Sequence, residues 1–190
     1  MSQEVTKSEP QWANPGALGL VAFGFSTMLL QVFNLGAITN VVPLVFGFFW
    51  GGLAQVIVGI IDGKRGDTFG LTAFTSYGLF WLALSFYFML SWGGLVKIEA
   101  DGLGWMCIMY AIFTGALTIG TFKMTWNHVI IFSTLTILFI LLAGHFLAGW
   151  SSKIAGVEGL ICGASAAYAG IAVALNAKFG KTVCPMGICK

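Results

Sequence analysis

The chain has 190 residues, of which 58% are hydrophobic and 8% are charged, and its formal net charge is +2. An average soluble domain is about 25% charged, so a soluble protein of this length would lack the polar surface needed to cover so many apolar side chains. The composition therefore predicts an integral membrane protein, and the small net charge argues against nucleic acid as a partner.

The first fifteen residues, MSQEVTKSEPQWANP, are polar and lack the basic start of a signal peptide. We expect residues 1–15 to be retained as an N-terminal segment. No charged residue follows until Asp62, and a spanning helix needs about 20 mostly apolar residues. This stretch predicts two spans, over residues 16–34 and 41–61, joined by the turn LGAITN.

Four more uncharged stretches follow, over residues 68–96, 102–122, 124–152 and 159–177. The breaks between them carry glycine and charged or polar residues, as turns do: DGKRGD, WGGLVKIEADG, TFKMTWN and GWSSK. The apolar runs are continuous rather than alternating, which favours helices over a barrel. The sequence therefore predicts an all-α integral membrane protein with six transmembrane helices over residues 16–177 and a tail over residues 178–190.

The distribution of lysine and arginine predicts the orientation, because these residues concentrate on the cytoplasmic side. With the N-terminus inside, the cytoplasmic segments hold Lys7, Lys64, Arg65, Lys123, Lys178, Lys181 and Lys190. The outer loops then hold Lys97 and Lys153. We expect a multi-pass protein of the cell membrane with both termini, and the tail, in the cytoplasm.

The first span opens with Asn14-Pro15-Gly16. Asparagine is a good N-cap and proline suits the first helical position. The free N–H groups of such a helix start and its dipole attract anions. Asn14 is therefore a candidate substrate-binding residue, although a plain helix start explains the same residues.

Polar side chains inside the apolar spans mark a candidate path for a solute. The candidates for substrate binding along it are Thr27, Gln55, Thr75, Thr114 and Thr118. A threonine in a membrane helix commonly bonds to its own backbone instead. The presence of polar groups in several spans favours a lined path.

No lysine or arginine falls in the middle of a span, so a fully dehydrated strong anion would lack a counter-charge. A weak acid avoids this cost if it stays partly hydrated or passes as the neutral acid. This favours small monocarboxylates over phosphate or sulfate, but the same lining suits a neutral solute. Glu158, His128 and His145 lie near span ends; we interpret them as interfacial polar residues, with a proton acceptor or relay as the alternative.

The sequence contains no HExxH or GxSxG motif, no paired intramembrane aspartates and no zinc-ligand spacing of its cysteines. We therefore expect a protein that is not an enzyme and has no cofactor or metal site.

Several blocks of the chain resemble the acetate uptake transporter family, which includes bacterial acetate/succinate–proton symporters and fungal ammonia/acetate export proteins. The blocks are NPGALGLVAFGFST, FGFFWGGLAQVIVG, GDTFGLTAFTSYGLFWL, TLTILFILLA, GLICGASAAYAG and FGKTVCP. The resemblance implies that the six helices of each protomer surround a central pore and that protomers assemble as a homo-hexamer. It also implies a narrow apolar gate formed by Phe23, Tyr77 and Leu135. Such a ring would expel water from the pore and block ions.

Three functions remain in competition at this point. The first is transport of acetate and similar monocarboxylates, with succinate as a further substrate, by a channel or by a proton-coupled permease. The second is a channel for a neutral small solute such as ammonia or water. The third is a membrane scaffold without transport activity. The resemblance favours the first.

Overall fold

The computed structural model describes residues 12–189. Within that range, six apolar helical segments are long enough to cross a membrane, as predicted. In chain order the elements are α1 (Gly16–Asn34), α2 (Val42–Phe46), the π-helical segment η1 (Gly47–Ala54), α3 (Gln55–Lys64), α4 (Thr68–Trp92), α5 (Ala100–Thr121), α6 (Trp126–Ala148) and α7 (Ser152–Phe179). α2, η1 and α3 run on without a break and form the second span.

The last helix begins earlier than the apolar run suggests. α7 starts at Ser152, after Ser151, whose hydroxyl accepts the N–H of Lys153 at 3.4 Å. The prediction placed the start of this span at residue 159. The predicted start was too late because a charged residue ends the apolar part of a helix without ending the helix. Glu158 therefore lies inside α7 and not at its end.

Two other helices end earlier than predicted, and each is followed directly by glycine. α4 ends at Trp92, just before Gly93 and Gly94, and Gly94 has φ +73°. α6 ends at Ala148, and Gly149 has φ +69°. A left-handed residue stops a helix, and glycine adopts that conformation without a Cβ clash.

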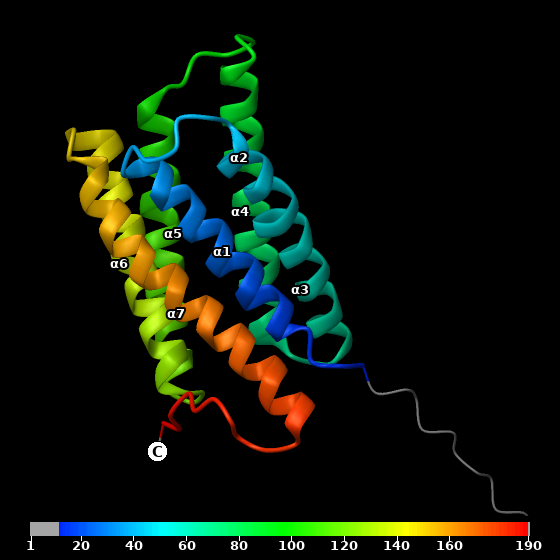
Figure 1. Ribbon diagram of the computed structural model, residues 1–190. Coiled ribbons are helices and arrows are strands. Elements are labelled where there is room, and N and C mark those ends of the chain that lie inside the picture. Colours follow the sequence, from blue (N-terminus) through cyan, green and yellow to red (C-terminus); the bar gives the residue numbers. More distant parts are fainter. Residues whose placement is uncertain (1–11, 190) are drawn as a thin grey trace, which may run out of the picture.

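The helices form one bundle in which α1 packs against α7, α7 against α6, and α6 against α5 (Figure 1). On the other side, α1 also contacts η1, and η1 and α3 pack against α4. Within residues 12–189, α4 and α5 are not among the closely packed helix pairs. Side chains close this seam, as where the Tyr110 hydroxyl donates to the Ser76 carbonyl at 2.9 Å.

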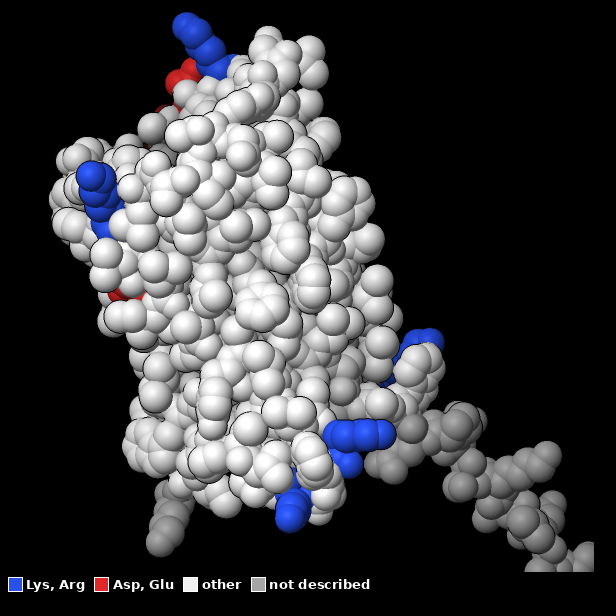
Figure 2. Space-filling model, viewed as in Figure 1, with Lys and Arg blue, Asp and Glu red and all other residues white. Residues whose placement is uncertain are grey.

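Both ends of the described chain lie at the same end of the bundle, together with the α3–α4 and α5–α6 turns (Figure 1). Figure 2 shows that, on the visible face, most charged side chains lie toward the two ends, and that the broad flank between them is uncharged apart from a small acidic patch at its left edge. Such a flank is what a lipid-facing surface requires.

The π-helical segment η1 packs closely against α4. A Cβ added at Gly47 or at Gly51 would lie 2.8 Å from the Trp81 ring. Glycine at both positions therefore lets the indole of Trp81 lie directly on the η1 backbone. Trp81 is 3% exposed, and its ring helps to form the apolar interior described next.

Candidate transport path

A cavity of about 290 Å³ opens at the end of the bundle that holds both chain ends, and we call it the vestibule. Its apolar wall includes Leu20, Ala73, Phe74, Ile131 and Phe132, and its polar lining includes Asn14, Asp62, Asp67 and His128. The vestibule is large enough for several water molecules or a small organic acid.

A second and much smaller cavity, the far cavity, lies deeper in the bundle. Its volume is about 30 Å³, which is room for about one water molecule. Thr27 and Gln31 of α1 supply polar groups to it, and Trp81, Leu138 and Phe139 are among its apolar lining residues.

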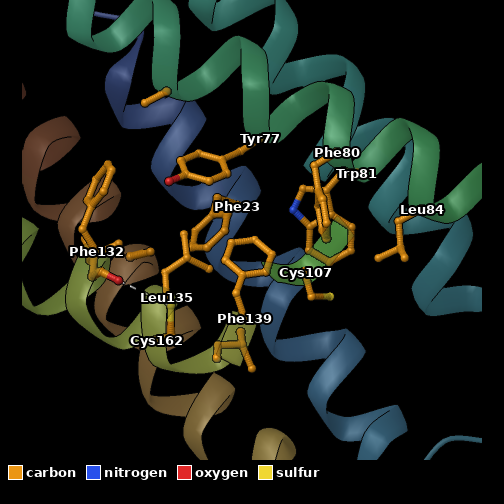
Figure 3. Packing of buried hydrophobic residues seen from close by; sticks show 14 of the residues in the cluster. Phe23, Tyr77, Phe80, Trp81, Leu84, Cys107, Phe132, Leu135, Phe139 and Cys162 are labelled. Carbon is orange, nitrogen blue, oxygen red and sulfur yellow. Dashed lines mark hydrogen bonds between the residues drawn. The ribbon is translucent and has the colours of Figure 1, made fainter. Parts of the chain in front are cut away.

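Phe23, Tyr77 and Leu135 line both cavities and so lie at the junction between them. They come from α1, α4 and α6, and they point toward one another in Figure 3. The rings of Phe23 and Tyr77 have centroids 6.2 Å apart. All three side chains are buried, with exposed fractions of 6%, 4% and 3%.

The ring of Tyr77 is held from several sides. Its hydroxyl lies 2.9 Å from the Thr114 hydroxyl, and Thr114 itself is fully buried. The Phe113 and Phe132 rings meet it edge-on, with centroids 5.7 and 6.2 Å away. A hydrogen bond together with aromatic packing limits the rotation of this side chain.

The other polar candidates divide into four groups. Thr27 lines the far cavity, whereas Thr114 supports Tyr77 from behind. The Thr118 hydroxyl donates to the Thr114 carbonyl at 2.8 Å, which is the bonding of a threonine to its own helix. Gln55 and Thr75, both within the described range, are not among the residues that line either cavity.

Asn14 lies at the mouth of the vestibule, as expected for a residue at the start of the first span. Its Oδ1 accepts the N–H of Gly16 at 2.9 Å. The N-cap position belongs to Pro15 rather than to Asn14, so the helix begins one residue later than the capping pattern indicates. The side chain of Asn14 still binds a free N–H at the helix start.

Residues 180–189 also form part of the vestibule, which sequence patterns did not indicate. Met186 lines the cavity. The carbonyls of Met186 and Gly187 accept the free N–H groups of Asn127 and Trp126 at the start of α6, at 3.1 and 3.2 Å. The Asn176 side chain holds the other side of this tail segment, since it bonds to the backbones of Val183 and Cys184.

The charged groups of the vestibule are unexpected for a path that anions would take. Asp67 caps α4, with Oδ1 accepting the N–H of Gly70 at 2.8 Å. Asp62 is 3% exposed and pairs with Arg65 at 3.6 Å. Because Arg65 offsets one carboxylate, the vestibule presents a negative rather than a positive charge to a solute. Among residues 12–189, no cluster of three or more His, Cys, Asp or Glu side chains is placed to hold a metal ion.

The chain is similar to known transport proteins of membranes. The succinate-acetate/proton symporter SatP of Escherichia coli (strain K12) is 44% identical over 180 residues, covering 92% of this chain and 95% of that protein. Ammonia transport outward protein 2 of Saccharomyces cerevisiae is 34% identical over 181 residues, covering 87% of this chain and 64% of that protein. These relatives are named as transporters and not as enzymes.

A solved structure, that of the bacterial acetate channel SatP, is similar with a TM-score of 0.89 and 42% sequence identity, covering 93% of this chain and all of that one. The sequence profile of the GPR1/FUN34/yaaH family matches residues 2–186. The resemblance that the sequence blocks indicated is therefore confirmed. The chain belongs to the GPR1/FUN34/yaaH family.

Proposed function

We propose that this protein transports acetate and similar small monocarboxylates, with succinate as a further substrate, across the cell membrane. The path runs through the vestibule, past the junction of Phe23, Tyr77 and Leu135, and into the far cavity. We propose that these three side chains are the gate.

The observation that carries the proposal is the junction itself. Two cavities meet at the same three buried side chains, one each from three helices. Rings of this kind exclude water and therefore ions, because an ion would have to shed its hydration shell to pass. A small carboxylic acid has a methyl group that suits the apolar ring.

We further propose that the acid crosses with a proton or in its neutral form. The carboxylates of Asp62 and Asp67 face the vestibule, so a bare anion would meet like charge there. A neutral acid avoids both this repulsion and the cost of dehydration at the gate. Of the two mechanisms, the proposal therefore favours a proton-coupled permease over a channel for the anion.

The proposed setting is a homo-hexamer with both termini in the cytoplasm. The two ends of the described range, residues 12 and 189, lie at one end of the bundle, which is consistent with a common side of the membrane. Many large apolar side chains on the flank are exposed and are available to lipid or to neighbouring protomers. Sizing of the purified protein in detergent tests the assembly, and a lone monomer would count against it.

A channel for ammonia is the second candidate function. One relative carries the name of an outward ammonia transporter. An apolar gate that passes a neutral acid would also pass a neutral base of similar size. The two functions differ in their response to added unlabelled acetate. Unlabelled acetate competes with labelled acetate for uptake at a shared site. It leaves the ammonia flux unchanged if ammonia and acetate do not share a site.

The deciding experiment is uptake of labelled acetate into proteoliposomes near pH 7, with and without an inward proton gradient. Protein-free vesicles are the essential control, because acetic acid crosses lipid unaided. We expect protein-dependent uptake that the gradient accelerates. Protein-dependent uptake at the same rate with and without the proton gradient would favour an anion channel. The absence of protein-dependent acetate uptake would refute the proposed function.

A further inference from the structure

His128 lines the vestibule, and its imidazole can bind a carboxyl group. It is the third residue of α6. The chain has two histidines, and the other, His145, lies near the opposite end of the same helix, with Nδ1 2.7 Å from the Trp150 carbonyl oxygen. His128 is therefore the histidine that the fold brings to the proposed path.

The neighbouring threonine orients the imidazole. The Thr125 hydroxyl oxygen accepts the backbone N–H of His128 at 3.4 Å and lies 2.7 Å from His128 Nδ1. If its proton goes to Nδ1, the hydroxyl is satisfied both as acceptor and as donor. This pairing leaves the ring proton on Nε2, so the imidazole has an N–H to offer to a ligand.

The remaining polar groups of the vestibule are mostly acceptors. Asp62 and Asp67 are carboxylates, and the Tyr77 hydroxyl is paired with Thr114. Asn14 uses its Oδ1 on the Gly16 N–H and keeps its amide hydrogens as donors. The side chains that line the vestibule thus offer a carboxylate two kinds of donor, the His128 imidazole and the Asn14 amide.

We propose that His128 is a substrate-binding residue that donates its Nε2–H to the carboxyl group of the acid in the vestibule, with the Asn14 amide as the second donor. The apolar wall of Leu20, Phe74 and Ile131 receives the hydrocarbon part. The acid is thereby held in front of the gate, head group toward the mouth and methyl toward Phe23. This inference rests on the proposed function and assigns a role to a residue that the gate does not include.

The two histidines allow a direct test on the unmodified full chain. In protein labelled with [15N]histidine, the ring signals of His128 and His145 are recorded during an acetate titration at constant ionic strength. We expect the His128 signals to shift and saturate while those of His145 stay in place. His128→Gln assigns the signals.

Transport by variants gives a second readout. His128→Leu removes the donor at similar volume and should raise the half-saturating acetate concentration about ten-fold or more, as expected for a lost hydrogen bond to a charged or polar head group. His128→Gln keeps an N–H donor and should restore binding to within about three-fold. His145→Gln is the matched control and should behave as the unmodified protein.

Two results would overturn the inference in distinguishable ways. The reconstituted protein could transport acetate while its His128 signals do not shift, or His128→Leu could keep the original half-saturating acetate concentration. In either case His128 has no binding role and the proposed function stands. If the unmodified protein neither transports acetate nor shows shifted signals, the proposed function fails, and the role of His128 fails with it.

Discussion

Single side chains decide what passes the proposed gate. Leu135 and Leu138 lie on α6 one turn apart, and each is 3% exposed. Leu135 lines both cavities, whereas Leu138 lines the far cavity alone. The two leucines therefore differ in their relation to the junction and hardly at all in type or burial.

Leu135→Ala should widen the junction and relax the size limit of the path. We expect the flux of butyrate relative to acetate to rise roughly ten-fold, since one or two methylene groups in a tight apolar site are worth about that much discrimination. Competitive uptake of the two acids into proteoliposomes measures the ratio. Leu138→Ala is the control: both changes should destabilise the fold by roughly 2–5 kcal/mol, so only selectivity separates them. An equal rise in both variants would remove Leu135 from the gate.

In the contact between α1 and α7, the two helix backbones approach each other closely. A Cβ added at Gly24 of α1 would lie 2.5 Å from the Ala167 nitrogen and 2.6 Å from the Gly163 carbonyl oxygen of α7. Backbones approach this closely only where side chains are absent. α1 carries Phe23, so the same contact places one third of the proposed gate.

Gly24→Ala should push α1 away from α7 and cost roughly 1–3 kcal/mol, the range for overpacked sites. Unfolding in mixed micelles measures the loss. Gly115→Ala on α5 serves as the comparison, because its Cβ would meet only the Thr136 methyl at 3.7 Å and the helix tolerates alanine well. If Gly24→Ala were as stable as Gly115→Ala, the close approach of the two helices would be wrong.

A few hydrogen bonds hold the tail segment 180–189 against the bundle. The side chain of Asn176 makes three of them. Its Oδ1 accepts the N–H groups of Val183 and Cys184 at 2.7 and 2.9 Å, and its Nδ2 donates to the Cys184 carbonyl at 2.8 Å. Each such hydrogen bond contributes about 0.5–1.5 kcal/mol. The tail covers part of the vestibule through Met186.

Asn176→Ala should release the tail without unfolding the bundle. We expect faster hydrogen exchange at the amides of Val183 and Cys184, and also at Trp126 and Asn127, which donate to the tail carbonyls. Asn40→Ala removes one hydrogen bond, to the Val42 N–H, in the α1–α2 loop and should leave these amides unchanged. Unchanged exchange in Asn176→Ala would mean that other contacts hold the tail.

At the scale of the whole molecule, the cysteines report on orientation. Cys107 and Cys162 are 2% and 0% exposed, so reagents in water do not reach them. Cys184 and Cys189 are partly accessible in the tail, at the end of the bundle that also holds the start of α1. With both termini in the cytoplasm, these two thiols face the cell interior.

A membrane-impermeant maleimide should therefore label the unmodified protein only after the cells are permeabilised. Lys97→Cys, in the loop between α4 and α5, provides the opposite case and should be labelled in intact cells. Mass spectrometry of the labelled peptides locates the adducts. Labelling of Cys184 or Cys189 in intact cells, at the rate seen for Lys97→Cys, would invert the proposed orientation.

The apolar runs by themselves determined the number of spans. A helix that crosses a bilayer needs about 20 apolar residues whatever it packs against, so this property is local and can be read from the chain. Matching sequence blocks also led to the family and to Phe23, Tyr77 and Leu135, which the fold brings to one junction. The gating role of these residues stays a prediction.

Only the tertiary structure decided which polar groups meet the path. Thr27 and Thr75 are both threonines inside apolar spans, yet Thr27 lines the far cavity and Thr75 packs against Gly59 of α3. In lipid the helices are apolar all round, so the pattern of a span does not tell its inner face from its outer face. The placement of His128 and of Met186 in the vestibule depends on how α6 and the tail dock, which no local pattern encodes.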